Sequence, residues 1–292
     1  MSTSSRFTKF LENIQLTDVQ VSNGKASREA VVGTLNSTYY GSTSNTNNSV
    51  YVGSWAKFTR IRPPRDVDVL YDLPKAVYDR FQLRTGNRQS QLLQEVKAVL
   101  LAAYPNTLIR GDGPIVIVPF ATFSVEVIPS FKLTDGKSWV CLTEGGGRYK
   151  TADYAAEASY IADSDTATNG KTRHLVRMMK RWQAECSVPI KSFHIELTSA
   201  LFLANWVHKG ESRSYYDCMV RDYLAYLVSR ANGHVYAPGT GEQMALGEAW
   251  LSRAKTALDR ATKACTHELT PAPAWACEEW RKIFGADYPS ND

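Results

Sequence analysis

The sequence has no long hydrophobic run. One of its longest apolar stretches, ALFLA at residues 200–204, is far shorter than the about 20 residues that cross a bilayer as a helix. The first residues, MSTSSRFTK, also lack the apolar stretch of a secretory signal peptide. These absences predict a cytoplasmic protein without a membrane partner.

Cysteine is scarce and scattered. The 292 residues include five cysteines and no C-x-x-C pair. The segment Cys265-Thr266-His267 cannot by itself complete a four-ligand zinc site. Isolated cysteines in an odd number predict buried, reduced thiols, which suit a reducing cytosol.

The sequence also lacks a large excess of either positive or negative charge. The chain has 34 Lys and Arg against 29 Asp and Glu, a net charge of +5. Duplex-binding proteins usually carry a concentrated basic stripe, so this balance does not indicate one. It is compatible with a polyphosphate ligand held in one local basic pocket.

The first half of the chain mixes helical patterns with short β-rich segments. Residues 1–40 carry helical patterns, and the Ser/Thr/Asn-rich run at 41–49 predicts a loop. Apolar residues recur at helical spacing over 90–104. Four segments favour strands, the last two of them joined as a hairpin by Ala121-Thr122: residues 50–52, 66–71, 115–120 and 123–128.

From about residue 153 the pattern is almost entirely helical. The predicted helices cover residues 173–186, 192–208, 215–231, 241–267 and 274–284. The sequence therefore predicts an α/β lobe followed by a helical lobe. A cleft between two such lobes is the natural place for a ligand.

Two acids in one predicted strand form the first candidate site. Successive side chains of a strand point to opposite faces, so Asp66 and Asp68 share a face and Val67 and Val69 face the core. Neighbouring carboxylates repel each other unless a cation lies between them. A hard divalent ion with oxygen ligands, Mg²⁺ or Mn²⁺, is the obvious candidate.

A third acid and a glycine-serine pair extend this site. Glu126 lies in another predicted strand, and beside the first strand it would complete a three-carboxylate site for two ions. Two such ions suit in-line displacement at phosphorus. Upstream, Gly53 would let the backbone approach phosphates, and the Ser54 hydroxyl could bond to one.

Each of these features alone has a plainer explanation. A D-x-D pair is common on surface strands and at turns, a single Glu in a strand usually faces solvent, and a Gly-Ser pair is usually a turn. The order of the features is more informative. A Gly-Ser loop, about a dozen residues, a D-x-D strand and then a later acid on a strand together favour a phosphoryl-transfer site.

The motifs resemble those of the bacterial cGAS/DncV-like nucleotidyltransferases (CD-NTases), in the polymerase-β-like superfamily. The matching stretches are G-S-x(4)-T from Gly53, D-V-D-V-L from Asp66 and V-E-V-I-P-S-F from Val125. RHLVRMMKRW at 173–182 resembles the spine helix of the family, and SFHIE at 192–196 resembles its S-Y-H-L-E segment. The ending from Ala274 to Pro289 is similar too, so the resemblance runs from about residue 50 to 289.

The resemblance implies a fold and a set of substrate contacts. It implies an α/β (α+β) nucleotidyltransferase core with a mixed sheet and N-terminal helices over residues 1–165. A C-terminal helical lobe would cover 166–292, with the active site in the cleft between the two. Lys180 and Ser192 would contact the outer phosphates, and Phe193 would stack on a nucleobase.

The implied function is the joining of nucleoside triphosphates with release of pyrophosphate. Asp66, Asp68 and Glu126 would hold two Mg²⁺ or Mn²⁺ ions, while Gly53 and Ser54 cradle the triphosphate. The expected product is a cyclic oligonucleotide messenger made from ATP and GTP for anti-phage (CBASS) signalling, with a cyclic purine dinucleotide such as cyclic GMP–AMP favoured over a trinucleotide. A separate effector protein would bind it.

Two features of the sequence depart from the family pattern. The third acid is Glu where many members have Asp, so Asp112 or Asp135 stays an alternative ligand. The zinc-ribbon insertion of the animal sensor is absent, so duplex DNA is not an implied requirement.

Two rival functions also stay open. One is a template-independent transferase that makes linear oligonucleotides or extends RNA, and the other is a catalytically dead binding module. The bases joined, the linkage and the activating signal stay open.

Overall fold

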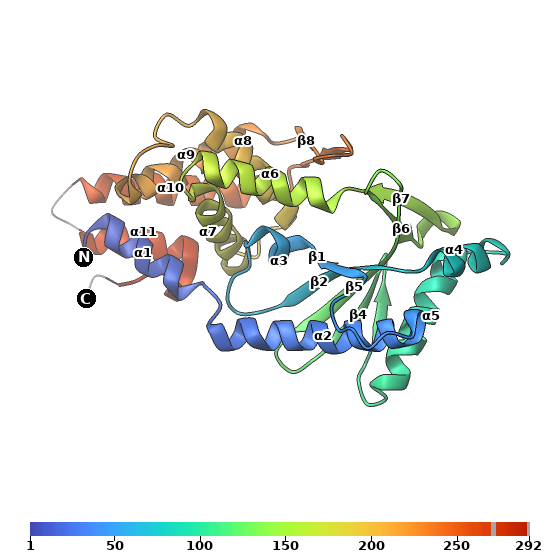
Figure 1. Ribbon diagram of the computed structural model, residues 1–292. Coiled ribbons are helices and arrows are strands. Elements are labelled where there is room, and N and C mark those ends of the chain that lie inside the picture. Colours follow the sequence, from blue (N-terminus) through green and yellow to red (C-terminus); the bar gives the residue numbers. More distant parts are fainter. Residues whose placement is uncertain (270–272, 291–292) are drawn as a thin grey trace. The chain divides into compact units, whose positions relative to one another are not determined.

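The computed structural model describes residues 1–269 and 273–290, which form two compact units (Figure 1). The sheet unit comprises Leu16–Phe58 and Pro64–Ala158. The helical unit comprises Met1–Gln15, Thr59–Pro63 and the described residues from Ser159 onward. Each unit has its own hydrophobic core.

One seven-stranded mixed sheet forms the centre of the sheet unit. Its strand order is β1-β2-β5-β4-β3, with β6 paired to β5 and β7 paired to β6. β2 and β5 run parallel, and the other neighbouring pairs are antiparallel. The strands are β1 (Ser49–Tyr51), β2 (Asp66–Asp72), β3 (Arg110–Asp112), β4 (Ile115–Pro119), β5 (Ser124–Lys132), β6 (Ser138–Leu142) and β7 (Arg148–Ala152). This architecture confirms the predicted α/β class with a mixed sheet.

The four predicted strands correspond to β1, β2, β4 and β5, and β4 and β5 form the predicted hairpin. Residues 41–48 form the predicted loop before β1. β5 continues to Lys132, beyond the predicted end at residue 128. The predicted helix at 90–104 is α5 (Arg88–Ala103).

Helices α2 (Asp18–Tyr40) and α5 cover one face of the sheet (Figure 1). Local signals define their ends. A capping box between Thr17 and Gln20 begins α2, and Gly41 ends it in the left-handed conformation at φ +60°. The Asn87 side chain accepts the amide hydrogen of Ser90 and begins α5. Apolar side chains of both helices pack with those of the strands: Val31, Leu35, Leu92, Val96, Val67, Val69, Val125 and Val127.

Five long helices and an N-terminal helix build the helical unit. They are α1 (Thr3–Asn13), α7 (Lys171–Glu185), α8 (Ser192–Asn205), α9 (Tyr216–Ser229), α10 (Leu251–Glu268) and α11 (Pro273–Phe284). Helix α6 (Tyr154–Ala167) begins in the sheet unit and continues into the helical unit. The short α4 (Lys75–Gln82) lies within the sheet unit. The aromatic residues Trp182, Trp250 and Trp280 lie in the core of the helical unit.

The predicted division at residue 165 placed every N-terminal helix with the sheet, but α1 belongs to the helical unit. Its apolar face explains the difference. Phe7 and Phe10 are fully buried among aromatic side chains, and the Phe7 ring meets the rings of Trp280 and Tyr288 edge-on at 5.3 Å.

The prediction of a helix from residue 241 is wrong over its first ten positions. His234–Tyr236 (β8) and Gln243–Ala245 (β9) form an antiparallel hairpin, and α10 begins only at Leu251. Gly239, Gly241 and Gly247 take φ values of +75°, +68° and +63°. These left-handed conformations are incompatible with a continuous right-handed helix.

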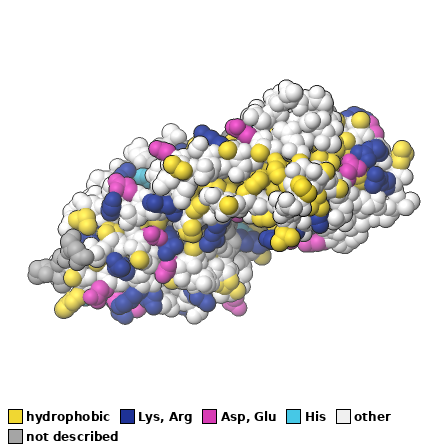
Figure 2. Space-filling model, turned by 90° about the horizontal axis from the view of Figure 1, so that it is seen from below, with side chains coloured by type: hydrophobic (Ala, Val, Ile, Leu, Met, Phe, Trp, Pro, Cys, Tyr) yellow, Lys and Arg dark blue, Asp and Glu magenta, His cyan; other side chains and the backbone are white. Residues whose placement is uncertain are grey.

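On the face shown in Figure 2, Lys and Arg side chains lie among Asp and Glu side chains, and hydrophobic side chains gather between the charged groups. This distribution agrees with the small net charge of +5. Within residues 1–269 and 273–290, no helix is both long and apolar enough to cross a membrane.

Candidate active site

The three predicted acids lie together at one end of the sheet. Parallel pairing of β2 with β5 sets Asp68 opposite Glu126, and Asp66 is two positions earlier on the same face. All three side chains are half-buried, and each offers a carboxylate oxygen within 4.8 Å of the others. Val67 and Val69 point the other way and are fully buried. Such an oxygen-only donor set fits hard divalent cations.

The alternative third acids, Asp112 and Asp135, are not members of this cluster. Asp112 is exposed on the edge strand β3, two strands away from β5, and is not a member of the three-carboxylate cluster. Asp135 follows the far end of β5, whereas Glu126 is near the beginning of that strand. Glu126 is therefore the acid that this fold brings to Asp66 and Asp68.

The electrostatic environment of Glu126 opposes ionisation. Burial is the main cause that raises the pKa of its carboxyl group, and the negative charges of Asp66 and Asp112 raise it further. The positive charge of Arg110 acts in the opposite direction. A divalent cation would remove this repulsion and draw the carboxylate into its ionised form.

Gly53 and Ser54 belong to the five-residue helix α3 (Gly53–Lys57), so the prediction of a loop is wrong at this position. Gly53 has a φ of +55°, and a Cβ atom there would lie 2.0 Å from Oδ2 of Asp68. That distance is far below any normal contact. Glycine is thus required because the backbone passes directly against the Asp68 carboxylate.

Helix α3 is fastened to the strand that carries the acids. The indole N–H of Trp55 donates to the carbonyl of Asp66 at 2.8 Å. The amide of Val52 donates to the carbonyl of Asp68 at 3.1 Å. The Trp55 ring stacks on Tyr51 at a centroid distance of 5.4 Å. These contacts hold the Gly53-Ser54 segment beside Asp68.

A buried ion pair behind α3 was not predicted from the sequence. The Lys57 ammonium group lies 3.1 Å from Oε2 of Glu157 on α6, and Lys57 is 3% exposed. Tyr154 is close to this pair: burial raises the pKa of its phenol, and the charges of Glu157 and Asp68 raise it further. The phenol therefore stays protonated near Asp68. Only the tertiary fold brings these residues together, which is why no local pattern indicated them.

The remaining predicted contacts, Lys180, Ser192 and Phe193, belong to the helical unit. The Lys180 ammonium group is 2.6 Å from Oε1 of Glu196 and 3.0 Å from the Thr59 hydroxyl. Ser192 is the first residue of α8, and its hydroxyl donates to the Gln183 side chain at 3.1 Å.

Phe193 is partly buried against the core of the helical unit. The convergence of Lys180, Ser192 and Phe193 with the acids stays a prediction. Within the helical unit, the structure adds Glu196 to the residues around Lys180. This acid of the SFHIE segment pairs with the Lys180 ammonium group, and no sequence pattern indicated that contact.

Replacing Glu126 tests the third ligand. Because the pKa of Glu126 is raised, its ionisation weakens the metal-free fold as pH rises above the ordinary value of 4.5. Glu126→Gln is therefore expected to unfold at an equal or higher temperature than wild type at neutral pH, yet to lose most pyrophosphate release. Glu126→Asp should keep part of the activity. A fully active Glu126→Gln would remove Glu126 from the ligand set.

Breaking the Lys57–Glu157 pair tests the support of α3. Glu157→Gln leaves a buried ammonium group without its carboxylate, so we expect lower thermal stability and a fall in kcat. Glu157→Asp should restore part of both. Glu95→Gln is the matched control, because Glu95 pairs with Arg80 at 2.7 Å in the same unit. If Glu157→Gln and Glu95→Gln lower kcat equally, the Lys57–Glu157 pair has no special role in positioning α3.

A mixed sheet with a D-x-D strand, an acid on its parallel neighbour and a Gly-Ser helix pressed against the second Asp defines the core of a nucleotidyltransferase. The family model described as "Second Messenger Oligonucleotide or Dinucleotide Synthetase domain" (SMODS) matches residues 1–164. The chain belongs to this family of bacterial cGAS/DncV-like nucleotidyltransferases.

A curated relative of this chain is an oligonucleotide cyclase. The CBASS oligonucleotide cyclase CdnC of Escherichia coli is 26% identical over 185 residues, which cover 61% of this chain. The match spans 56% of CdnC, so this chain aligns with a little over half the length of that relative.

Solved structures share the fold over nearly the whole chain. The structure of CdnC of E. coli MS115-1 with ATP matches with a TM-score of 0.70 at 20% identity. The match covers 99% of this chain and 98% of the CdnC chain. Vibrio cholerae DncV, a cyclic AMP-GMP synthase solved with the linear intermediate pppA(3′,5′)pG, has a TM-score of 0.68 at 13% identity, covering 99% of this chain and 87% of its own.

Proposed function

We propose that this protein is a metal-dependent nucleotidyltransferase that joins ATP and GTP into a cyclic oligonucleotide for CBASS signalling and releases pyrophosphate. The observation that carries the proposal is the cluster of Asp66, Asp68 and Glu126, in which the Asp68 carboxylate lies directly against Gly53. An acidic cluster alone is ambiguous. Its position on parallel strands of an SMODS fold, beside a glycine that admits no side chain, supports catalysis over a catalytically dead binding module.

Asp66, Asp68 and Glu126 would hold two Mg²⁺ or Mn²⁺ ions. When bound, such ions lower the pKa of the attacking hydroxyl and stabilise charge on the leaving oxygen. The acids orient this chemistry because they lie on two hydrogen-bonded strands. Gly53 lets the backbone pass directly against the Asp68 carboxylate, and the Ser54 hydroxyl can donate to a phosphate oxygen.

The helical unit would supply the other substrate contacts. Lys180 would bind the outer phosphates with Ser192, and Phe193 would offer an aromatic face to a base. Glu196 and Thr59 hold the Lys180 ammonium group in one position. Because an ammonium group has three donors, it can keep both of these bonds and donate to a phosphate oxygen.

Removing the Lys180 charge should weaken substrate binding. Lys180→Met is expected to raise KM more than it lowers kcat, because phosphate contacts act in both the ground and the transition state. It also leaves Glu196 buried without its cation, which should cost about 3 kcal/mol of stability. Lys180→Met/Glu196→Gln should recover the stability and keep the raised KM. If the double variant recovers KM as well, Lys180 acts only on the fold.

Ring closure requires at least two successive bond-forming reactions in one site. The linear intermediate must be released or turned before its second end reacts, so the acceptor position must accept a base that has already served in the donor position. Stacking tolerates such an exchange better than a full set of base-edge hydrogen bonds. Purines offer the larger stacking surface, so we favour a cyclic purine product. Among such products we favour a dinucleotide such as cyclic GMP–AMP over a trinucleotide, because its ring needs the fewest bond-forming reactions.

Product analysis tests the proposal. The protein is incubated with all four ribonucleoside triphosphates and Mg²⁺ or Mn²⁺, and the products are treated with phosphatase before chromatography and mass spectrometry. A cyclic product has no terminal phosphate and stays unchanged. A major product that shifts on phosphatase treatment, or that lengthens steadily with time, is linear and favours the rival transferase.

A further inference from the structure

One basic side chain lies on the sheet face that carries the acids. The register of the sheet places four residues in one row across four strands: Asp68 on β2, Glu126 on β5, Ile117 on β4 and Arg110 on β3. Residues paired in this way point to the same face of a sheet. Arg110 therefore shares a face with the three acids, opposite the face that α2 and α5 cover.

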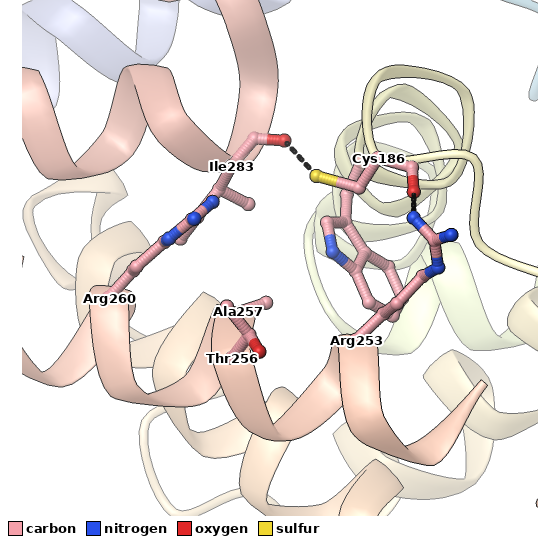
Figure 3. Close-up of a pocket in the computed structure, with 7 residues that line it drawn as sticks. Cys186, Arg253, Thr256, Ala257, Arg260 and Ile283 are labelled. Carbon is pink, nitrogen blue, oxygen red and sulfur yellow. Dashed lines mark hydrogen bonds between the residues drawn. The ribbon is translucent and has the colours of Figure 1, made fainter.

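The Arg110 guanidinium group is not held by the protein. Arg110 is exposed, and its side chain forms no hydrogen bond or ion pair with any residue that the structure describes. Other arginines are fastened. Arg80 pairs with Glu95 at 2.7 Å, and Figure 3 shows the bond from Arg253 to the Cys186 carbonyl beside a hollow of the helical unit. The five N–H donors of Arg110 thus stay available for a ligand.

The Arg110 charge reaches the acidic cluster. Burial and the charges of Asp66 and Asp112 raise the pKa of Glu126, whereas the Arg110 charge lowers it. Neighbouring strands lie about 4.8 Å apart, so the Cα atoms of Arg110 and Glu126 are about 10 Å apart across two strand spacings. A nucleotide whose hydroxyl lies at the acids extends over such a distance. The guanidinium group is therefore near enough to contact a substrate bound there.

The geometry of the reaction places one substrate on the Arg110 side. In phosphoryl transfer the attacking and leaving oxygens lie roughly in line, on opposite sides of the phosphorus. The leaving pyrophosphate belongs to the triphosphate that Ser54 is proposed to bind. Helix α3, which carries Ser54, begins on the β1 side of β2, because the amide of Val52 continues the pairing of β1 and donates to the Asp68 carbonyl.

The attacking hydroxyl must then approach from the other side of β2, over β5, β4 and β3. This hydroxyl belongs to the acceptor nucleotide. Arg110 lies at the end of that row, so the acceptor nucleotide is the substrate that it can contact.

A surface role explains only part of this arrangement. Charged residues on an edge strand keep it from pairing with another sheet, and β3 is an edge strand. Such a charge can serve that purpose from either face of the sheet. Protection of the edge therefore accounts for a charge on β3, but not for an unpaired guanidinium group in the row of Asp68 and Glu126.

A phosphate of the acceptor fits Arg110 in each bond-forming reaction. Guanine offers two acceptors, O6 and N7, to a guanidinium fork, whereas adenine has a donor in place of the first. A contact with the base edge would therefore be lost when the acceptor base changes. A phosphate on the 5′ side of the acceptor is always present, first in a triphosphate and at ring closure in the phosphodiester of the linear intermediate.

We propose that Arg110 binds the 5′-phosphate of the acceptor nucleotide and thereby helps to place the attacking hydroxyl. Arginine forms charge-assisted hydrogen bonds with phosphate oxygens, and its exposed position leaves these donors accessible. The inference rests on the proposed function and adds a substrate-binding residue to the sheet unit.

Guanosine and GMP test this contact, because they differ only in the 5′-phosphate. Neither can act as a donor, since neither carries a pyrophosphate to release. Each is incubated with ATP, divalent metal and the full-length protein, and mass spectrometry separates the two joined products, which differ by one phosphate group. Initial rates give kcat/KM for each acceptor.

Arg110→Gln should lower kcat/KM for GMP about tenfold and leave that for guanosine within about twofold, since only the phosphate contact is lost. The KM for ATP, measured with guanosine as acceptor, should not change. Arg110→Lys keeps the charge and should retain part of the preference for GMP. Equilibrium dialysis of GMP with a non-hydrolysable ATP analogue should show the same loss of affinity without turnover.

Lys132→Gln is the matched control. Lys132 is exposed on the same strand and the same face as Glu126, but about 20 Å further along β5. Its removal changes the net charge as Arg110→Gln does, so we expect kcat/KM for both acceptors to stay near that of wild type.

An unchanged kcat/KM for GMP in Arg110→Gln would overturn the inference and leave the proposed function intact, because wild type still joins ATP to both acceptors. An equal loss with guanosine would place Arg110 against the base or the sugar and would overturn the phosphate contact. If wild type joins ATP to neither acceptor nor to GTP, the proposed function fails and the inference fails with it.

Discussion

Asp66→Asn and Asp68→Asn should each lower pyrophosphate release by at least about a hundredfold, equivalent to about 3 kcal/mol of transition-state stabilisation. Asparagine keeps the shape of the side chain and removes the charge that holds a divalent cation. The metal-free fold should not be weakened, because the three carboxylates repel one another. Initial rates of pyrophosphate release and thermal unfolding without metal measure the two effects.

Asp72→Asn is the matched control for this pair. Asp72 lies on the same strand and accepts the Ser130 hydroxyl at 2.7 Å, outside the three-carboxylate cluster. We expect its rate to stay close to that of wild type. Turnover within tenfold of wild type in Asp66→Asn or Asp68→Asn would contradict the assignment of the site.

Gly53→Ala should abolish activity through geometry alone. Its Cβ would fall 2.0 Å from Oδ2 and 2.8 Å from Cγ of Asp68, so the carboxylate must move away from the metal site. The φ of +55° adds about 1 kcal/mol of backbone strain for alanine. We expect at least about a hundredfold loss of pyrophosphate release together with a lower unfolding temperature.

Gly41→Ala separates the two causes. Gly41 has a φ of +60° in the same unit, but a Cβ atom there meets nothing within 4 Å. Its loss of stability should therefore reflect backbone strain alone, and its activity should stay near that of wild type. If Gly53→Ala behaves like Gly41→Ala, close approach to Asp68 is not what requires glycine at position 53.

The acids could be found from the sequence because their signal is local. The alternation of Asp66, Val67, Asp68 and Val69 has the period of a strand with one buried face, and the structure buries both valines. Placing Glu126 beside them required a pairing between distant segments. The family resemblance supplied that pairing, and the parallel register of β2 with β5 confirms it.

The contacts that support the site were not predictable in the same way. Lys57 pairs with Glu157, a hundred positions later in the chain. Lys180 contacts Thr59 and Glu196, and these three residues come from three separate segments. Such pairs have no periodic signature, since their spacing is set by tertiary packing. The hairpin of β8 and β9 was also not predicted. Apolar spacing over 241–267 favoured a helix, and the left-handed conformations of the glycines there are visible only in the structure.

Metal binding tests the central claim most directly, because it does not depend on an activating signal. Mn²⁺ bound to the protein can be counted by electron paramagnetic resonance in the presence of a non-hydrolysable ATP analogue. We predict two tightly bound Mn²⁺ per chain in wild type and in Asp72→Asn, and loss of tight binding in Asp66→Asn and Asp68→Asn. Equal Mn²⁺ binding in all four proteins would show that Asp66, Asp68 and Glu126 do not form the metal site.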